Sequence, residues 1–523
     1  MKKPASQKQQ TEGAERPNIV LILADDMGFS DLGCYGGEIS TPHLDRLAAN
    51  GLRFSHCYNN AVCMPTRASL LTGLYPQQVG AGDRGRLQET GNVTIAEILR
   101  SAGYCTLMSG KWHNGNTPGE LPVARGFDRY YGLLSGSSNY FNPGLKREGE
   151  PEPAHKSLGN MRPWGKDGEI LYPYTPEDLH FYATDAFTKQ ALAFLEQYGH
   201  EEQPFFLYLA YTSPHFPMQA WPEDIAKYRG RYLVGWEVLR EQRYRRLLDI
   251  GILEKPWKLS ARDPLSPPWD TVTDKESWDL KMAVYAAMIE RMDHGIGRVL
   301  EKIRALGKEA NTVVIFLSDN GGCGEHIDRT PEVGPGPVNS YSTVDAPWAN
   351  VSNAPFRRFK VFHYEGGVAT PLIIAWPRLI TQGGGICHEV SHVMDFMPTL
   401  LDLSHSFYPP ENHGHPVLPM EGRSLLPALR GESLREREPL CWEFQGCRAL
   451  RHGQWKIVTQ GPPRNHVNIK IEPGHEPWEL YDLDADRCET NNLASKYPEI
   501  VKELEAKWQA WERCCPVEVK GED

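Results

Sequence analysis

Four continuous apolar runs constrain the fold of this chain more than any other feature. They cover residues 18–24, 205–211, 312–318 and 371–376. A strand buried on both faces of a parallel sheet is apolar throughout, whereas a half-exposed strand alternates apolar and polar residues. Helical patterns fall between the runs, at 41–48, 94–102, 182–198 and 282–306, the first with Thr41 as N-cap and Pro42 at its first position. This alternation predicts an α/β fold, a large, mostly parallel sheet with helices on both faces.

Polar residues follow three of these runs. Asp25 and Asp26 follow the first, Asp319 and Asn320 follow the third, and His215 follows the second. Open α/β sheets bind ligands outside the carboxyl ends of their strands. We therefore expect these side chains to share one site.

The carboxylates at the strand ends favour a bound divalent cation. Either Asp25 or Asp26 alone could equally be a helix cap. Together with Asp319, however, they would repel one another unless a cation neutralised them. Asn320 adds an amide oxygen, and an all-oxygen ligand set favours Ca²⁺ or Mg²⁺ over zinc. A cage rich in protein ligands suits Ca²⁺ better, although Mg²⁺ is an alternative.

Basic side chains lie in the loops near these strand ends. Lys111 and His113 are two residues apart, so both point the same way in an extended segment. His215 follows a strand and Lys360 precedes one. Each alone is more often a solvated lysine or a structural histidine, and only their placement at successive strand ends favours a shared anion pocket.

Residues 63–73 predict the first turns of a helix with Cys63 near its N-terminus. Free N–H groups and the helix dipole favour an anion there, and Pro65 in the first turn costs no hydrogen bond. Arg67 lies one turn later on the same face. Cys63 could instead be an inert buried cysteine or a thiolate of lowered pKa, but a thiolate leaves the carboxylate cluster unexplained.

The length of 523 residues predicts roughly two to four domains. We predict a disordered polar leader over 1–16, a main domain over 17–436 and a smaller C-terminal α+β domain over 437–523. The last contains two strands and a turn over 448–458, a third strand over 478–483 and an amphipathic helix over 498–514. Residues 230–278, rich in Arg, Trp and Pro, are expected to form an excursion from the main domain.

Charge and composition exclude some classes of partner. The net charge of −11 argues against nucleic acid, although an acidic protein can hold a basic pocket for a small anion. No apolar run reaches about 18 residues, so we expect no transmembrane helix, and the leader lacks the apolar core of a signal peptide. The eleven cysteines show no zinc-site spacing. Their odd count leaves at least one outside any internal disulfide, for which Cys63 is the obvious candidate.

Six ordered motifs resemble the arylsulfatase-like, formylglycine-dependent sulfatases of the alkaline-phosphatase superfamily. Cys63 to Arg67 matches the family's signal for converting a cysteine to formylglycine (3-oxoalanine). The motifs span residues 25–28, 63–73, 110–113, 212–215, 318–322 and 360–367, and the resemblance extends from Asn18 to about Trp511. It implies an alkaline-phosphatase-like fold, a sulfuric ester hydrolase, and a maturation enzyme that modifies Cys63.

The resemblance also implies a role for each motif residue. The calcium ligands would be Asp25, Asp26, Asp319, Asn320 and the modified Cys63. The sulfate pocket would be lined by Arg67, Lys111, His113, His215 and Lys360. Two departures from the family pattern are Asn114, where leucine is common, and the absence of a histidine immediately before Glu365. A pocket serine of some relatives has only weak counterparts here, Ser135 and Ser137.

The implied chemistry is an in-line attack on sulfur by one hydroxyl of the hydrated aldehyde. The cation, Arg67, Lys111 and Lys360 would stabilise the charge on the sulfate oxygens. His215, with Lys360 as a second candidate, would protonate the leaving oxygen. His113 would then take the proton of the second hydroxyl, so that sulfate leaves by C–O cleavage.

Substrate and location follow from family analogy alone. We expect a sulfated carbohydrate, with aryl sulfates as surrogate substrates, and a periplasmic or secreted bacterial enzyme. The segment 228–246 could line the leaving-group side or equally form a domain interface. The alternatives are a phosphonate or phosphate ester hydrolase of the same superfamily and a catalytically silent binding protein.

Overall fold

The computed structural model describes residues 16–82, 86–88, 90–155, 161–461 and 477–515. The predicted leader lies outside these residues except for Arg16. The Arg16 guanidinium contacts the carbonyl oxygen of Ala102 and lies 5.4 Å from the centre of the Tyr104 ring. The leader's last residue is therefore part of the folded body.

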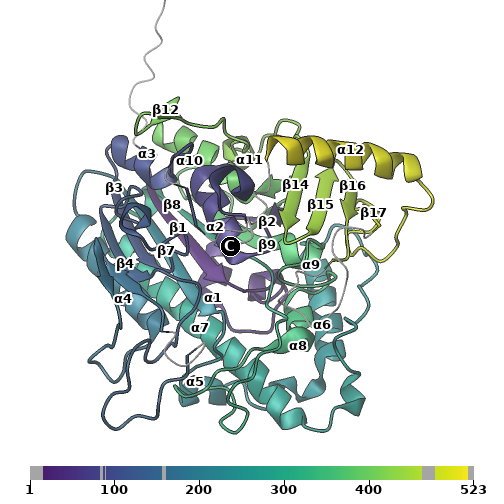
Figure 1. Cartoon of the computed structure of the whole chain (residues 1–523), viewed down its shortest axis with the longest axis horizontal. Coiled ribbons are helices and arrows are strands. Elements are labelled where there is room, and N and C mark those ends of the chain that lie inside the picture. Colours follow the sequence, from purple (N-terminus) through teal and green to yellow (C-terminus); the bar gives the residue numbers. More distant parts are fainter. Residues whose placement is uncertain (1–15, 83–85, 89, 156–160, 462–476, 516–523) are drawn as a thin grey trace, which may run out of the picture.

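Within the described residues, one large sheet of eleven strands forms the centre of the molecule (Figure 1). Its order is β10-β2-β9-β8-β1-β7-β3-β4-β5-β6, with β11 also paired to β2. The strands are β1 (Asn18–Asp25), β2 (Leu52–Tyr58), β3 (Cys105–Gly110), β4 (Arg129–Leu133), β5 (Trp164–Lys166), β6 (Glu169–Leu171), β7 (Phe205–Pro214), β8 (Thr312–Ser318), β9 (Ala369–Ala375), β10 (Gly385–Cys387) and β11 (Ser391–His392). The central neighbours β8, β1, β7 and β3 are parallel, so the predicted mostly parallel sheet is confirmed.

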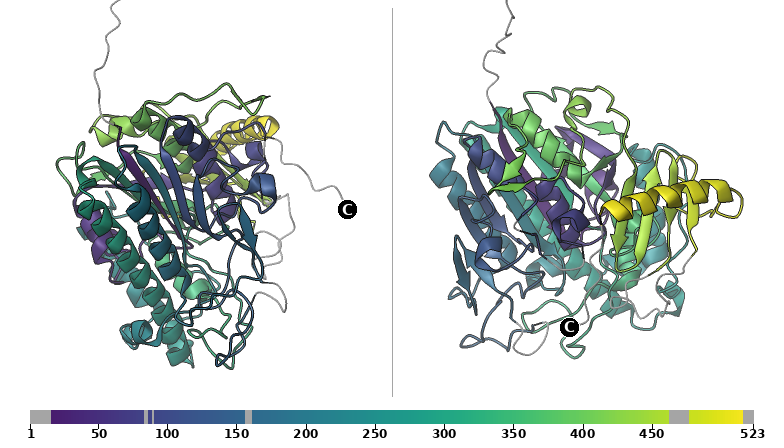
Figure 2. Two further views of the ribbon diagram at one scale, coloured as in Figure 1. Left: turned by 90° about the vertical axis from the view of Figure 1, so that its left-hand side faces the viewer. Right: turned by 45° about the horizontal axis from the view of Figure 1, so that its top comes forward.

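Helices cover both faces of this sheet, as Figure 2 shows from the side. The alternate residues of β1 explain why both faces are buried. Val20 and Ile22 pack in one core with α1 (Pro42–Ala49), α4 (Ala183–Tyr198) and α7 (Lys275–Ala305). Leu21 and Leu23 pack in a second core with α2 (Cys63–Thr72), α3 (Ile95–Ser101) and α10 (Phe396–Ser404). The remaining α-helices are α5 (Pro222–Ala226), α6 (Trp236–Asp249), α8 (Asp345–Ser352), α9 (Glu365–Val368), α11 (Leu426–Leu429) and α12 (Pro498–Cys514).

One apolar run forms a strand of the opposite direction. β9, predicted only as a buried strand, runs antiparallel to both of its neighbours, β8 and β2. Its amino end therefore lies at the same edge of the sheet as the carboxyl ends of β1 and β8. This reversal brings Lys360, which precedes β9 in the chain, to the strand ends that carry the aspartates.

The C-terminal elements form a separate antiparallel sheet. It contains β14 (Leu440–Phe444), β15 (Cys447–His452), β16 (Trp455–Val458) and β17 (Glu479–Asp482) in that order. A two-stranded hairpin, β12 (Glu411–Asn412) and β13 (His415–Pro416), precedes it. Helix α12 lies across the antiparallel sheet (Figure 2, right). The predicted division at residue 437 stays a proposal.

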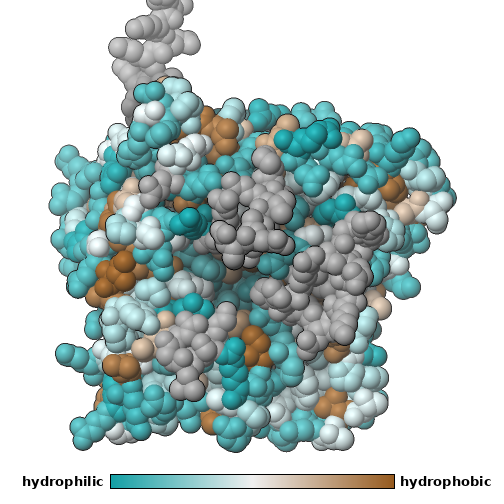
Figure 3. All heavy atoms as spheres, in the orientation of Figure 1, coloured by the Kyte–Doolittle hydropathy of each residue, from teal (hydrophilic) through white to brown (hydrophobic). Residues whose placement is uncertain are grey.

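The surface is mostly hydrophilic on the face seen in Figure 3, with small separate hydrophobic areas. Within the described ranges, no helix combines the length and apolarity needed to cross a bilayer. All eleven cysteines are described and none is in a disulfide; Cys514 is exposed and Cys515 is buried.

Candidate active site

The carboxyl ends of β1 and β8 bring the four predicted oxygen ligands together. Asp25 ends β1, Asp26 follows it, and Asp319 and Asn320 follow the neighbouring parallel strand β8. The backbone N–H of Asp26 donates to Oδ1 of Asp319 at 3.2 Å, and Nδ2 of Asn320 donates to Oδ1 of Asp26 at 2.7 Å. All four residues are buried.

The electrostatics of this cluster favour a cation. Burial raises the pKa of Asp25 well above its ordinary value, and the charge of Lys111 only partly offsets this. For Asp26, the charges of His215 and Lys360 outweigh burial and lower the pKa. Oδ1 of Asp25 and Oδ1 of Asn320 are buried without a hydrogen-bond partner. A divalent cation bound among the three carboxylates would provide a partner for both of these oxygen atoms.

Cys63 is the first residue of α2 and lies beside this cluster. Its Sγ is within 4.8 Å of carboxylate oxygens of Asp25 and Asp319, and 3.4 Å from Nδ1 of His113. Burial raises the pKa of the Cys63 thiol above its ordinary value, despite the charges of Lys111 and Lys360. A neutral thiol does not support the thiolate alternative.

Arg67 lies on the same face of α2 as Cys63, but its guanidinium is fully buried. Its Nε and one terminal nitrogen donate to Oδ2 of Asp319 at 3.0 and 2.8 Å, and the other terminal nitrogen donates to the carbonyl oxygen of Lys111 at 3.0 Å. Arg67 thus holds a carboxylate and the loop after β3, which favours a positioning role over direct contact with sulfate.

The two lysines reach the aspartates from opposite sides of β1 in the sheet. Lys111 follows β3, and its Nζ is 2.6 Å from Oδ2 of Asp25. Lys360 precedes β9, and its Nζ is 2.7 Å from Oδ1 of Asp26. Because Asp26 lies next to it, the pKa of Lys360 is raised despite burial. The Lys360 ammonium group therefore stays charged beside Asp26, or beside an anion bound there.

The two histidines differ in their hydrogen bonds. Nδ1 of His215 lies 2.6 Å from the carbonyl oxygen of Phe216, so this nitrogen carries a hydrogen, and Nε2 lies 3.5 Å from Asp26. Burial lowers the pKa of His215 to about 4. For His113, burial and the charges of Lys111 and Arg67 lower the pKa well below its ordinary value. Both rings are therefore neutral at neutral pH, which leaves a free lone pair on each.

Three non-glycine residues at or next to the site have a left-handed backbone conformation. Asp26, His113 and Val361, the neighbour of Lys360, have φ values of 66°, 54° and 84°. Non-glycine residues rarely adopt this region, and such residues cluster at functional sites.

The segment 135–138 lies beside His113. A Cβ built on Gly136 would come within 3.1 Å of the His113 ring. Ser135 and Ser137 are partly exposed. No sequence pattern indicates a role for Gly136. The residue matters because the His113 ring, which comes from another segment, lies where a larger side chain at this position would extend.

A supporting shell behind Asp26 also escaped the sequence analysis. Tyr285 donates from its hydroxyl group, which is 3.2 Å from the Asp26 carbonyl oxygen and 2.8 Å from Asp31. Arg243 donates to Asp31 at 2.7 Å and to Glu38 at 2.8 Å. Arg243 is fully buried in these ion pairs, so it supports the cluster from behind.

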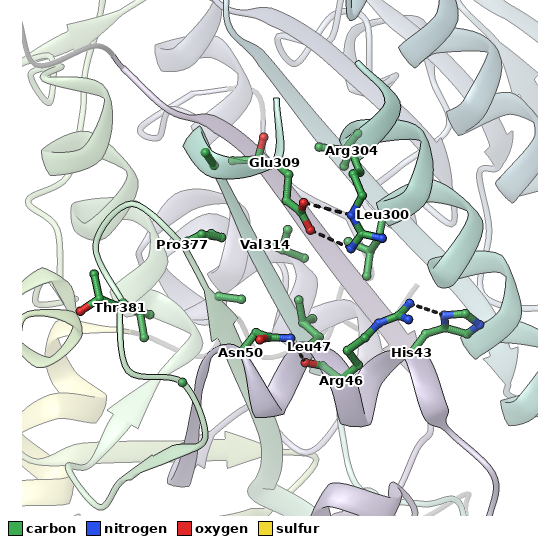
Figure 4. A pocket seen from close by; sticks show the side chains of 16 residues that line it. His43, Arg46, Leu47, Asn50, Leu300, Arg304, Glu309, Val314, Pro377 and Thr381 are labelled. Atoms are coloured by element: carbon green, nitrogen blue, oxygen red, sulfur yellow. Dashed lines mark hydrogen bonds and ion pairs between the residues drawn. The ribbon is translucent and has the colours of Figure 1, made fainter. Parts of the chain in front are cut away.

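A cavity of about 520 Å³ lies elsewhere, at the opposite edge of the sheet (Figure 4). His43, Arg46 and Leu47 of α1 line it, together with Thr312 at the start of β8 and Ala375 at the end of β9. It contains none of the predicted site residues.

Comparisons with known proteins agree with this geometry. The sulfatase family model matches residues 17–406, and the model of the N-sulphoglucosamine sulphohydrolase C-terminal region matches 357–513. An uncharacterized sulfatase of Schizosaccharomyces pombe is 34% identical over 95% of this chain and 94% of its own length. An arylsulfatase of Klebsiella aerogenes is 36% identical over 79% of this chain and 91% of its own length.

Solved structures extend the similarity to the fold. The crystal structure of Ps i-CgsB in complex with k-i-k-neocarrahexaose superposes with a TM-score of 0.67 and 26% identity, covering 95% of this chain and 92% of that one. With the carboxylate cluster and Cys63 placed at the strand ends, these matches show that the chain belongs to the sulfatase family, as a sulfuric ester hydrolase of the alkaline-phosphatase superfamily.

Proposed function

We propose that this sulfatase releases inorganic sulfate from a sulfated carbohydrate, using a formylglycine formed from Cys63 and a calcium ion. The observation that carries the proposal is the position of Cys63, on the first turn of α2 beside Asp25, Asp319 and His113. The carbohydrate class is supported by the k-i-k-neocarrahexaose complex of the structural relative.

The residues present fit a calcium ion. Asp25, Asp26, Asp319 and Asn320 would hold it, with the modified Cys63 as a further ligand. Oδ1 of Asp25 and Oδ1 of Asn320 accept no hydrogen bond, although Oδ1 of Asp25 lies 3.8 Å from the Arg67 guanidinium group, and such an ion needs acceptors of this kind. Bound there, the cation supplies positive charge that polarises the nucleophile and the sulfate oxygens. Mg²⁺ stays an alternative.

The modification fits the position of Cys63 as well. A hydrated aldehyde supplies one hydroxyl for attack on sulfur and a second for release of sulfate, whereas the unmodified thiol lacks the second. His113, neutral and 3.4 Å from Sγ of Cys63, is placed to accept the proton of that second hydroxyl.

Lys111 and Lys360 bring positive charge to the sulfate side of the cluster. We assign Lys360 the larger share in protonating the leaving oxygen, because its ammonium group is charged. His215 shares this role only when its Nε2 is protonated, since Nδ1 already donates to the Phe216 carbonyl group. Arg67 acts through Asp319 and the Lys111 backbone.

Mass spectrometry of the Cys63 peptide tests the modification. Protein from the native host, or from a host that co-expresses a formylglycine-generating enzyme, should carry the aldehyde and hydrolyse aryl sulfates. The matched control is Cys63→Ala, which should fold and bind calcium through the four remaining ligands, more weakly, but be inactive. A fully active protein that carries only the thiol would contradict the mechanism.

Two matched comparisons test the substrate class. kcat/KM for an aryl sulfate should exceed that for the corresponding phosphate and phosphonate esters, and the reverse order would favour the hydrolase alternative. Sulfate release from sulfated oligosaccharides, compared with their desulfated forms as binding controls, tests the carbohydrate assignment. A periplasmic or secreted location stays a prediction, which fractionation of the source organism would test.

A further inference from the structure

A second group of metal-ligand side chains lies outside the sulfatase site. One ring nitrogen each of His56 and His388 and one carboxylate oxygen of Glu254 lie within 4.8 Å of one another. His56 is buried, whereas His388 and Glu254 are partly exposed, with side-chain exposures of 34% and 42%. The group shares no residue with the Asp25 cluster.

The large sheet fixes the two imidazoles. His56 lies in β2, and His388 lies between β10 and β11, both of which pair with β2 in parallel register. The Oγ of Ser55 lies 2.7 Å from Nδ1 of His56 and 2.8 Å from Nδ1 of His388, so one hydroxyl group orients both rings. Such second-shell hydrogen bonds are typical of histidine ligands.

The third side chain comes from a different part of the fold. Glu254 follows α6, in a segment anchored by Lys255 and Trp257, which both donate to the carbonyl oxygen of Asp484 at 3.1 Å. A carboxylate oxygen of Glu254 lies 3.5 Å from Nδ1 of His388. Its exposed side chain can move the short distance needed to close on an ion, while the two rings stay in place.

The charges around the group allow a cation. Burial lowers the pKa of both His56 and His388, so both rings are neutral at neutral pH and each carries one lone pair. The single hydrogen of the Ser55 hydroxyl group can occupy only one of these lone pairs, so a cation would compete with Ser55 for at most one ring nitrogen. Two guanidinium groups also act on His56: that of Arg487, which is paired with Glu365 at 2.9 Å, and that of Arg451, which contacts the Tyr58 hydroxyl group. Glu254 supplies a negative charge that neither imidazole balances.

We propose that His56, His388 and Glu254 bind a zinc ion that ties β2, the β10–β11 connection and the segment after α6 together. Two imidazoles and one carboxylate are a borderline ligand set that suits Zn²⁺ and excludes Ca²⁺ and Mg²⁺, which prefer oxygen. Three protein ligands leave a fourth position for water. The ordinary alternative is a hydrogen-bonded histidine pair without a metal.

A zinc titration of the full-length protein distinguishes a zinc site from a metal-free histidine pair. The protein is freed of transition metals with a chelator and kept in excess Ca²⁺, so that the Asp25 cluster does not take up zinc. Zn²⁺ is then titrated against a chromophoric competitor. We expect one zinc ion per chain, and at least a ~10-fold weaker Kd in His388→Ala and in Glu254→Gln, whose side chains are exposed enough for the variants to fold.

Two controls assign the binding to this group. His200→Ala removes an exposed histidine after α4 and should leave the zinc Kd unchanged. Asp25→Asn alters the sulfatase site and should also retain the zinc ion. Zinc should raise the Tm of the wild-type protein but not that of His388→Ala. Absence of zinc binding under these conditions, or equal affinity in wild type and His388→Ala, would overturn the proposal.

Discussion

The most informative stability test concerns Lys456, which joins the antiparallel sheet to the main domain. Its Nζ, fully buried, is 2.9 Å from both Glu365 and Glu489. Glu365 begins α9 and also pairs with Arg487 at 2.9 Å and with the Tyr58 hydroxyl group at 2.9 Å. Removal of Lys456 therefore leaves Glu365 paired, but takes from Glu489 the cation that balances its charge.

The change Lys456→Met should destabilise the protein by about 3–5 kcal/mol, the usual cost of leaving one partner of a buried ion pair. Burial is the main cause that raises the pKa of Glu489, to about 7; the charge of Lys456 lowers this pKa, and the charge of Glu365 raises it by a smaller amount. Loss of Lys456 raises this pKa again, so the carboxyl group can limit the cost by taking up a proton near neutral pH.

The sign of the pH dependence follows from this raised pKa. An acid whose pKa is higher in the folded state binds protons more tightly there, so its contribution to stability falls as pH rises from the unfolded pKa to the folded one. In the wild type this loss ends near pH 7. In Lys456→Met it should continue above pH 7, by up to about 1.4 kcal/mol per pH unit.

Urea unfolding followed by tryptophan fluorescence measures the effect, because Trp442 and Trp508 pack in the antiparallel sheet and α12. The double variant Lys456→Met/Glu489→Gln should recover most of the lost stability, since no unpaired charge stays buried, and should lack the pH dependence above pH 7, since the amide does not titrate. Lys502→Met, at an exposed position of α12, is the matched control. A single variant within about 0.5 kcal/mol of the wild type, or a double variant no better than the single one, would refute the reasoning.

Three further predictions concern the sulfatase site. Arg67→Lys cannot reproduce the two bonds to Asp319, so the calcium Kd should weaken and kcat should fall about 10²-fold; an unchanged calcium titration would contradict the positioning role. Asp25→Asn removes one cation ligand, and the calcium needed to restore activity after chelation should rise, whereas identical recovery curves would exclude Asp25 as a ligand. For Lys360→Ala, the loss of kcat should be about 10²–10⁴-fold larger on a substrate with a poor leaving group than on one with a good leaving group, and for His215→Ala this difference should be smaller. Full activity of His215→Ala on the substrate with the poor leaving group would contradict a role for His215 in proton donation.

Local sequence predicted many of the helices and strands. The run ending at Ser318 coincides with β8, and α12 has the predicted bounds, because apolar pattern and helix periodicity are local properties. Helix α7 begins at Lys275, well before the predicted start at residue 282. Asp274, whose side chain accepts from the backbone N–H of Ser277, was the available N-cap signal.

The sequence also predicted that the polar residues at several strand ends share one site, but it did not predict strand direction. An apolar run does not indicate whether its strand is parallel or antiparallel to its neighbours. The antiparallel direction of β9, which brings Lys360 to Asp26, therefore depends on how the chain crosses the sheet. The roles of Arg67 and Gly136 likewise depend on partners from distant segments.

The sequence by itself determined which residue types follow each strand, and therefore the family and the class of chemistry. Only the tertiary structure decided which of these side chains touch one another, which are buried, and which charges are balanced. It also brought together His56, Glu254 and His388, which are far apart in the chain. The physical reason is that hydrogen bonds and ion pairs depend on distance and burial, which arise only when the segments pack.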